Sequence, residues 1–211
     1  AVGDQVAATL VAKLAPKVQA LKIGAGTSCG LDMGPLVTGA ARDKVKGYVD
    51  AGVAQGATLV VDGRGLVVPG NEAGYFLGGS LFDNVTADMS IYQEEIFGPV
   101  LCIVRVGSLE EAMQLINDHE YGNGTCIFTR DGEAARLFCD EIEVGMVGVN
   151  VPLPVPVSYH SFGGWKRSLF GDLHAYGPDG VRFYTKRKTI TQRWPQRASH
   201  EAAQFAFPSN G

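Results

Sequence analysis

The sequence has no hydrophobic run long enough to cross a bilayer, and it has no excess of positive charge. Its 18 basic and 22 acidic residues give a formal charge of −4. This balance argues against a nucleic-acid-binding protein, because no basic surface is available to attract phosphates. Charged residues make up 19% of the 211 residues and hydrophobic residues 45%, so disorder is not expected either. The length suits one large domain, or one domain with an appendage.

Cysteine and histidine are too sparse and too widely spaced to suggest a metal site or a disulfide framework. There are four of each: Cys29, Cys102, Cys126, Cys139, His119, His160, His174 and His200. We therefore expect no bound metal and a reducing compartment. Cys102, Cys126 and Cys139 fall in predicted core elements and are expected to be small buried side chains. Cys29 has no neighbouring base that would make it a nucleophile.

The first residues have the pattern of a helix and contain no signal peptide. Val6, Leu10 and Leu14 recur at i, i+4 and i+8, with Asp4 as a candidate N-cap. We expect Pro16 to end this helix or to begin a second short one. Because the chain begins with Ala1 and is helical almost at once, we expect it to be a piece of a longer protein. A processed initiator methionine or a trimmed tag is the alternative.

The middle of the chain alternates predicted helices and strands. Helices are predicted over Thr38–Gln55, from the capping box Ser108-x-x-Glu111 to Ile116, and from Asp131 to Ile142. Strands are predicted over Ala57–Val61, Tyr75–Phe82, Val100–Val106, Thr125–Thr129 and Met146–Val149. The last three strands and the helices between them form a β-α-β-α-β run. Such a run predicts parallel strands joined by right-handed crossovers, and therefore an α/β fold.

The character of the sequence changes after Asn150. Val151–Val157 has a proline at every second residue and should be extended, but not a central strand. Gly163–Gly180 is rich in loop-forming residues. Val181–Thr191 alternates charged with β-branched or aromatic residues, which predicts a long strand. The tail from Trp194 to Gly211 is polar and is expected either to dock on another surface or to be disordered.

Two glycine-rich stretches invite a functional interpretation that their context weakens. Ile23–Gly30 resembles a phosphate-binding loop, but such a loop follows a strand and opens a helix, and here a helix precedes it. Ser161–Ser168 places cations beside aromatic rings, and Arg167 could hold a carboxylate or a phosphate. A surface turn is the favoured interpretation of this second stretch.

Gln93–Val100 is the most informative stretch of the sequence. Two adjacent glutamates precede an aromatic residue, a Gly-Pro turn and a buried strand. In extended backbone Glu95 and Phe97 point to the same side. An anionic acceptor beside an aromatic face suits a ligand with vicinal hydroxyls and a flat ring, such as a nucleoside. From the spacing alone, a solvated pair of glutamates stays the alternative.

This stretch resembles the signature of the NAD(P)-dependent aldehyde dehydrogenase superfamily. Supporting motifs follow in the same order: Gly34–Val37, Tyr121-Gly122, Phe128–Asp131, Gly145–Asn150 and Phe162–Lys166. Further segments resemble the CoA-acylating methylmalonate-semialdehyde dehydrogenase branch: Val149–Pro156, Gly171-Asp172, Gly180–Thr185 and Lys188–Trp194. That branch converts malonate or methylmalonate semialdehyde to acetyl- or propionyl-CoA, releases carbon dioxide and reduces NAD.

The resemblance implies a fold and a division of the chain. The fold would be an α/β aldehyde-dehydrogenase-like catalytic domain, with a largely parallel sheet flanked by helices. Residues 1–178 would belong to the catalytic domain, and residues 179–211 would form a C-terminal oligomerisation strand and tail. The NAD-binding domain and the nucleophilic cysteine would lie before Ala1. None of the four cysteines aligns with that nucleophile, so no catalytic residue is expected within this chain.

The resemblance also implies roles for particular residues. Glu95 matches the glutamate that binds the nicotinamide ribose hydroxyls, and Phe97 the aromatic residue that packs near the nicotinamide. Asn150 to Phe162 corresponds to the loop that lines the substrate tunnel, with Phe162 near the aldehyde. The strand at 181–191 would pair across subunits in a homo-oligomer, a tetramer, with residues 188–192 in the contact. Lys166 and Arg167 receive no secure role.

Three further expectations complete the sequence-based hypothesis. The chain by itself would be inactive, and the parent enzyme would use NAD as cofactor and CoA as co-substrate. The location would be the bacterial cytoplasm, or the mitochondrial matrix of a eukaryote. The alternatives are a CoA-independent aldehyde dehydrogenase and a non-catalytic oligomerisation module.

Overall fold

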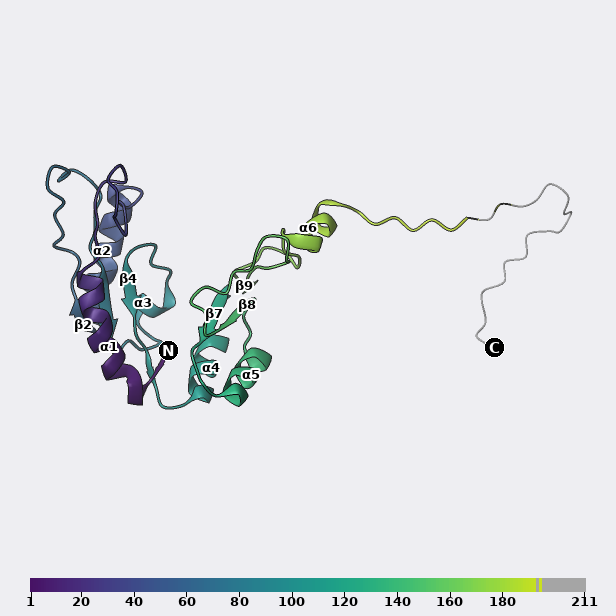
Figure 1. Ribbon diagram of the computed structural model, residues 1–211, viewed down its shortest axis with the longest axis horizontal. Coiled ribbons are helices and arrows are strands. Elements are labelled where there is room, and N and C mark those ends of the chain that lie inside the picture. The colour runs from purple at the N-terminus through teal and green to yellow at the C-terminus, as the bar shows by residue number, and fades with distance from the viewer. Residues whose placement is uncertain (193, 195–211) are drawn as a thin grey trace, which may run out of the picture.

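A three-stranded sheet between two helices forms the first half of the computed structural model, which describes residues 1–192 and 194. The strands are β2 (Thr58–Val61), β3 (Ser80–Asp83) and β4 (Val100–Cys102), with β3 in the centre. β4 runs parallel to β3 and β2 antiparallel. Helix α1 (Asp4–Gln19) packs on one face and α2 (Gly39–Ala54) on the other (Figure 1). All four residues of β3 are buried as a result.

The two faces of β3 carry different core clusters. Leu81 packs with Val61, Ile103 and the apolar stripe of α1. Phe82 packs with Tyr48 and Val49 of α2. Alternate residues of a strand point to opposite faces, so this arrangement follows directly from the period of the strand.

Helix α2 agrees with the sequence prediction at both ends. The hydroxyl of Thr38 accepts a hydrogen bond from the Ala41 N–H at 3.0 Å, which caps the helix. Val45, Tyr48, Val49 and Gly52 form its buried face at helical spacing. Gly52 lies against Phe82 and Ile91, where a Cβ would approach the two side chains to about 3 Å. The helix therefore packs closely on the sheet.

The predicted strand Val100–Val106 is divided in two in the structure. The Ile103 N–H still bonds to the Phe82 carbonyl beyond the end of β4. Asn84 adopts the left-handed conformation at φ 55°, and the N–H of Val85 after it bonds to the Ile103 carbonyl at 3.1 Å. The following β5 (Arg105–Val106) pairs in parallel with β1 (Val2–Gly3). The predicted strand therefore pairs first with β3 and then with β1.

Two other predictions in this half need correction. Pro16 lies within α1 and does not end it. The proline removes only the N–H that would bond to Ala12, which lies on the exposed side of the helix, and the Ala20 N–H bonds normally to the Pro16 carbonyl at 3.0 Å. The N-cap is Gly3, with Asp4 in the first turn. Only Ser80–Asp83 of the predicted strand Tyr75–Phe82 is regular, because the backbone at Gly78 instead contacts Gly63, whose carbonyl accepts its N–H.

The second half is a β-α-β unit with its own core. It contains α4 (Leu109–Asn117), β7 (Gly124–Ile127), α5 (Gly132–Glu141) and β8 (Met146–Val149), and β7 pairs with β8 in parallel. Met113, Phe138, Ile142 and Val144 form its buried cluster. β4 and β5 do not join this pair, so the predicted run is spread over separate sheets. The α/β class is confirmed, and within the described residues three of the five strand pairs are parallel.

The caps predicted for these two helices are present. The Ser108 hydroxyl accepts from the Glu111 N–H at 3.1 Å, and the Glu111 carboxylate accepts from the Gly107 N–H at 2.7 Å. The Asp131 carboxylate accepts from the N–H groups of Glu133 and Ala134.

The four cysteines are free thiols, and none of the three that were expected to be buried is fully buried. Cys102 and Cys126 are half-buried, and burial raises the pKa of the Cys102 thiol to about 11. Cys139 is exposed, so the expectation of a buried side chain is wrong there. It follows the buried Phe138 on α5, and one helical step of about 100° turns it outward.

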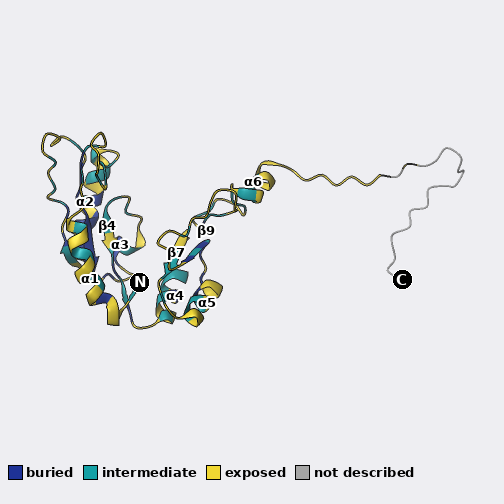
Figure 2. Cartoon of the chain, viewed as in Figure 1, coloured by how far each residue is buried: buried dark blue, intermediate teal, exposed yellow. Residues whose placement is uncertain are grey.

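The end of the described chain is an arm that leaves the body of the molecule (Figure 1). It begins with α6 (Gly177–Tyr184), so the predicted strand Val181–Thr191 is wrong over its first residues. Pro178 starts the helix and an ion pair between Asp179 and Arg182 supports it, whereas a strand needs a partner for its backbone groups. Residues 185–192 form no regular element and are exposed (Figure 2). Of the predicted tail Trp194–Gly211, only Trp194 lies within the described residues.

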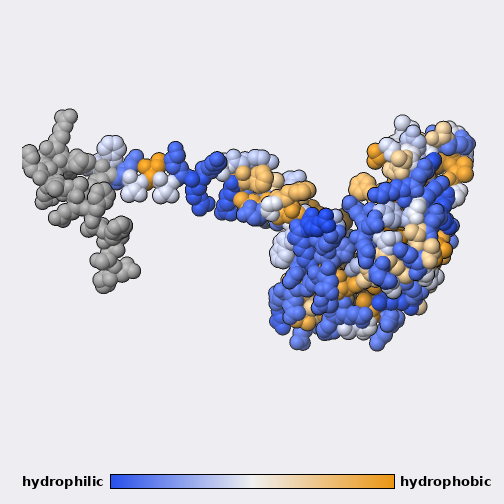
Figure 3. Space-filling view, turned by 180° about the vertical axis from the view of Figure 1, so that it is seen from behind, coloured by the Kyte–Doolittle hydropathy of each residue, from blue (hydrophilic) through white to orange (hydrophobic). Residues whose placement is uncertain are grey.

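The surface of the arm is partly hydrophobic. Val181, Phe183 and Ile190 are exposed, and Figure 3 shows hydrophobic side chains where the arm joins the body. In the part of the chain that the structure describes, no helix has the length and apolar character of a membrane span.

An ion pair joins the sheet of β3 to β5. The Asp83 carboxylate, 5% exposed as a residue, accepts two hydrogen bonds from the Arg105 guanidinium at 2.6 and 3.0 Å. The guanidinium holds the pKa of Asp83 below its usual value. The pair therefore stabilises the fold fully above the unfolded carboxyl pKa of about 3.9. This contribution is lost as the pH falls from there through the lower folded pKa.

We predict that Asp83→Asn lowers the free energy of unfolding at neutral pH by about 2 kcal/mol, since it leaves Arg105 without its anionic partner. Urea unfolding at neutral pH and near pH 3 is the measurement, and the variant should lose less stability on acidification than the parent chain. Asp62→Asn, which removes an exposed ion pair with the neighbouring Arg64, is the control and should change little. Equal acid sensitivity of Asp83→Asn and the parent would contradict the assignment.

Candidate functional site

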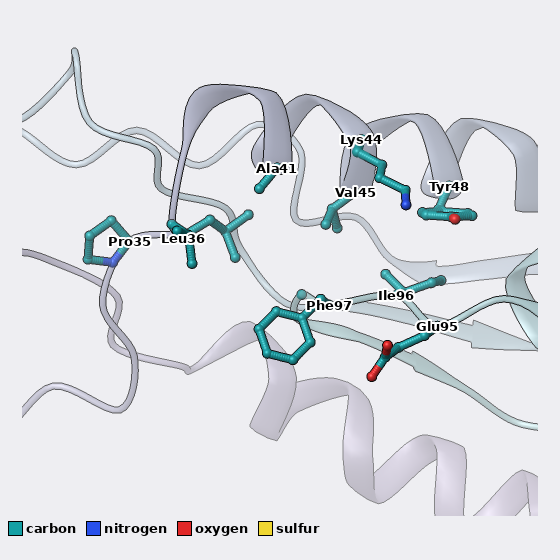
Figure 4. Close-up of a pocket in the computed structure, with 11 residues that line it drawn as sticks. Pro35, Leu36, Ala41, Lys44, Val45, Tyr48, Glu95, Ile96 and Phe97 are labelled. Atoms are coloured by element: carbon teal, nitrogen blue, oxygen red, sulfur yellow. The ribbon is translucent and has the colours of Figure 1, made fainter. Parts of the chain in front are cut away.

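The residues singled out in Gln93–Val100 lie at an open pocket of about 600 Å³. The pocket is bounded by the first turns of α2 on one side (Figure 4). The segment after α3 (Ser90–Gln93) bounds it on the other. Its lining comprises Pro35, Leu36, Val37, Ala41, Lys44, Val45, Tyr48, Glu95, Ile96, Phe97 and Gly98.

The backbone of this segment is extended, which separates its side chains to two sides. Ile96 points toward α2 and packs on the core cluster of Phe82, whereas Glu95 and Phe97 both point the other way (Figure 4). Their predicted common direction is thus present, although the regular strand begins only at Val100. A Cβ on Gly98 would lie 2.7 Å from Val45, so glycine is needed for the segment to approach α2 this closely.

The two adjacent glutamates have different environments. Glu94 accepts a hydrogen bond of 2.5 Å from the Tyr48 hydroxyl, and its carboxylate raises the pKa of Tyr48. Glu95 is exposed, and no donor of the described residues bonds to its carboxylate. Phe97 is 78% exposed. Glu94 therefore anchors the segment to α2, and Glu95 and Phe97 present an acceptor and a ring to a ligand.

Sequence reasoning missed the cation of this pocket. Lys44 lies one helical turn before Tyr48, and its Nζ is 5.6 Å from the centre of the Tyr48 ring. Its i, i+4 relation to Tyr48 was the available signal, but it acquires meaning only once α2 is placed beside Glu95. The pocket thus combines an anion, a cation, an exposed ring and an apolar wall.

A second pocket of about 450 Å³ shares Glu95 with the first. Its lining comprises Tyr92, Gln93, Glu94, Glu95, His119, Tyr121, Asn123 and Ser168. Tyr121 is the first residue of β6 (Tyr121–Gly122), and His119 lies two residues before it. Glu95 therefore lines both pockets.

The two predicted tunnel residues lie away from these pockets. Asn150 has φ 57°, and its carboxamide bonds to the N–H and the carbonyl of Thr129 at 2.9 and 3.0 Å. Phe162 is half-buried and stacks on Tyr176 with ring centres 4.5 Å apart. Neither residue lines the pocket of Glu95 and Phe97. The chain therefore brings Glu95 and Phe97 together at one pocket, whereas Asn150 and Phe162 have separate partners elsewhere.

The remaining candidates have structural partners. Arg167 pairs with Glu120 and lies 5.5 Å from the centre of the Tyr121 ring, which supports the interpretation as a surface turn. Lys166 donates to the carbonyls of Asn117 and His119. The loop at Ile23–Gly30 is followed by a helix only at Gly39, so the helix N-terminus that a phosphate loop requires is not adjacent.

The most voluminous of the described pockets, about 950 Å³, is a groove of different character. It lies between the first residues of the chain and the elements α4, β7 and α5. Its walls are mainly apolar, with Val6, Leu10, Ile116 and Phe138 among them. It offers packing surface and few groups that could do chemistry.

Comparison with known proteins gives consistent results. The model for the aldehyde dehydrogenase family matches residues 1–190. The chain is 85% identical over 208 residues to a malonate-semialdehyde dehydrogenase from Pseudomonas aeruginosa, covering 99% of this chain and 42% of the relative. A second malonate-semialdehyde dehydrogenase, from Halalkalibacterium halodurans, is 48% identical, covering 92% of this chain and 39% of the relative. The chain spans about two fifths of the length of these relatives.

Solved structures agree with the sequence comparison. A methylmalonate-semialdehyde dehydrogenase from Oceanimonas doudoroffii has a TM-score of 0.90 and 65% identity, covering 92% of this chain and 40% of that one. A Sinorhizobium meliloti structure, described as a methylmalonate-semialdehyde dehydrogenase complexed with NAD, has a TM-score of 0.91 and 55% identity. It covers 93% of this chain and 40% of that one.

Proposed function

The chain belongs to the aldehyde dehydrogenase family, and we propose that it supplies the cofactor-ribose contact and part of the substrate channel of an NAD-dependent malonate- or methylmalonate-semialdehyde dehydrogenase. The observation that carries the proposal is the free Glu95 carboxylate beside the exposed Phe97 ring. The identity to malonate-semialdehyde dehydrogenases supports the substrate class.

The residues of the pocket fit part of a dinucleotide. A carboxylate accepts hydrogen bonds from two neighbouring ribose hydroxyls, an exposed ring offers a face to a flat heterocycle, and Lys44 offers a positive charge to a phosphate. When bound, NAD accepts a hydride from the substrate. The part of Glu95 is to hold the ribose, and that of Phe97 is to restrict the position of the ring, so that the reacting groups meet in one geometry. Glu94 keeps both in place through Tyr48.

The nucleophile is proposed to be a cysteine in the part of the relatives that precedes Ala1. Cys102 is unsuited to that role, because burial raises its thiol pKa to about 11 and keeps it protonated. In the overall reaction malonate semialdehyde, CoA and oxidised NAD give acetyl-CoA, carbon dioxide and NADH. Methylmalonate semialdehyde gives propionyl-CoA in the same way.

The loop from Asn150 to Phe162 is proposed to line the substrate channel. Asn150 supports this role from one end, because its two bonds to Thr129 fix where the loop leaves β8. Phe162 contributes an aromatic face at the other end. In this division residues 1–178 belong to the catalytic domain and residues 179–211 to an assembly segment.

The arm is proposed to pair with a further copy of the chain in a homo-oligomer, a tetramer. Residues 185–192 leave their backbone groups available, and α6 exposes Val181 and Phe183. The free thiols fit a reducing compartment, which we propose is the bacterial cytoplasm, since the similar proteins come from bacteria.

We predict that Glu95→Gln slows hydride transfer about ten-fold, because a weaker ribose contact lets the nicotinamide leave its reactive position. The test uses a chimera in which the preceding part of the Pseudomonas aeruginosa relative is joined to Ala1, and measures NADH formation in a single turnover. Glu94→Gln is the matched control, since the Gln carbonyl can still accept from Tyr48. An unchanged single-turnover rate in Glu95→Gln would refute the role of Glu95.

Product analysis distinguishes CoA transfer from hydrolysis. We predict that the chimera, given malonate semialdehyde and NAD, forms acetyl-CoA and carbon dioxide with CoA present and little product without it. Malonate as the main product, with or without CoA, would favour the CoA-independent alternative. The chain without the preceding part is the control and is predicted to form no NADH.

The proposed assembly predicts that the chain is larger than a monomer by light scattering. Ile190→Pro should shift it toward the monomer, because proline removes a backbone N–H that a paired strand would use. Ile190→Val is the control and should leave the mass unchanged. A strictly monomeric parent chain would contradict both the homo-oligomer and the alternative role as an oligomerisation module.

A further inference from the structure

Lys166 is the most heavily engaged cation near the loop that carries Phe162. Its Nζ donates to the Asn117 carbonyl at 2.6 Å and to the His119 carbonyl at 3.2 Å, and only 21% of its side chain is exposed. The Glu143 carboxylate lies 3.9 Å from the same nitrogen. The side chain is thus enclosed by acceptors.

The two carbonyls belong to the end of α4, where the helix itself supplies no donors. Asn117 is the last residue of α4, and the last carbonyls of a helix require partners from elsewhere. A cation is favoured there because the helix dipole is negative at this end. The Asn117 side chain in turn bonds to the Glu141 carbonyl and the Glu143 N–H. Lys166 therefore meets the point where α4 and the segment after α5 are already joined.

The backbone around Lys166 is fastened to the same region. β9 (Trp165–Lys166) pairs antiparallel with β6. The Arg167 N–H bonds to the Glu120 carbonyl, and the Ser168 hydroxyl accepts from the Gly122 N–H. Lys166 has φ 52°, a conformation that favours glycine or asparagine over lysine. A lysine at such a position is better explained by its side-chain bonds than by its backbone.

The loop between Asn150 and this turn is hydrogen-bonded to the start of α6, which lies beyond the turn. The Gly177 N–H bonds to the Ser158 carbonyl, and the Ser161 hydroxyl donates to the Tyr176 carbonyl and accepts from the Asp179 N–H. Residues 151–161 are exposed except for Pro154. Asn150 fixes the first end of the loop through Thr129, and the turn at 164–168 fixes the second. Phe162 lies just before the turn at 164–168. His119 and Tyr121, in the segment to which this turn is bonded, line the pocket that contains Glu95.

We propose that Lys166 is a positioning residue that sets Phe162 relative to the Glu95 pocket, and thereby the affinity for the aldehyde. It acts through the carbonyls of Asn117 and His119 and touches neither substrate nor cofactor. The inference rests on the proposed function of Phe162 and Glu95, and it gives a role to a residue that the family resemblance left unassigned.

The test compares Lys166→Met, Lys166→Arg and Lys13→Met in the chimera described above. In Lys166→Met the KM for malonate semialdehyde should rise about ten-fold. The dissociation constant of NAD should change less than about two-fold, because the Glu95 segment is held by Tyr48 and not by Lys166. Lys166→Arg, which can donate to both carbonyls, should recover the KM. Lys13→Met removes an exposed lysine of α1 and should change neither quantity.

Each result decides the matter in one direction. An unchanged aldehyde KM in Lys166→Met, or an equal loss of aldehyde and NAD binding, would overturn the proposal. If the unsubstituted chimera forms no NADH, the proposed function fails. The attachment of the turn at 164–168 by Lys166 is then tested separately in this chain alone. With Trp194 replaced by Phe, Trp165 is the remaining tryptophan, and its emission should shift to the red in Lys166→Met and not in Lys166→Arg. No shift would show that Lys166 does not hold the turn.

Discussion

The arrangement of the site depends on the burial of β3 on both faces. Leu81 fixes α1 to one side of this strand and Phe82 fixes α2 to the other. Because α2 lies directly on Phe82, its first turns are held above the segment that follows α3. Gly52 and Gly98 allow the two close approaches that this packing requires. The pocket of Glu95 is thus a consequence of core packing as much as of the residues that line it.

Local chemistry made parts of this structure predictable. The helices α2, α4 and α5 begin where Thr38, Ser108 and Asp131 predict, because a cap is decided by a few neighbouring atoms. Strand partners were less accessible, since β4 and β5 are one run in the sequence and two ladders in space. Two local predictions failed because of their surroundings. Pro16 does not end α1, since the hydrogen bond that it removes lies on the exposed side of the helix. Val181 belongs to a helix and not to a strand, since Pro178 starts α6 three residues before it.

The site itself was half predictable for a related reason. The common direction of Glu95 and Phe97 follows from extended backbone, which any strand-like segment has. The different environments of Glu94 and Glu95 could not be predicted in this way, because they depend on Tyr48, which is 46 residues away from Glu94 along the chain. Lys44 was missed for the same reason, because its place in the pocket depends on how α2 packs beside Glu95. The family resemblance implies ligand contacts for Glu95 and Phe97, and the structure adds the hydrogen bond from Tyr48 to Glu94 that holds their segment against α2.

The stacked pair of Phe162 and Tyr176 joins the loop that we propose lines the substrate channel to the arm that we propose for assembly. Tyr176 is the residue immediately before α6, so a contact that immobilises the arm also restricts the ring of Phe162. Under the proposed function, association of subunits and recognition of the aldehyde are then coupled equilibria, in which ordering by one reduces the entropy cost of the other. Mutations that alter the quaternary structure would on this basis alter the affinity for the aldehyde as well.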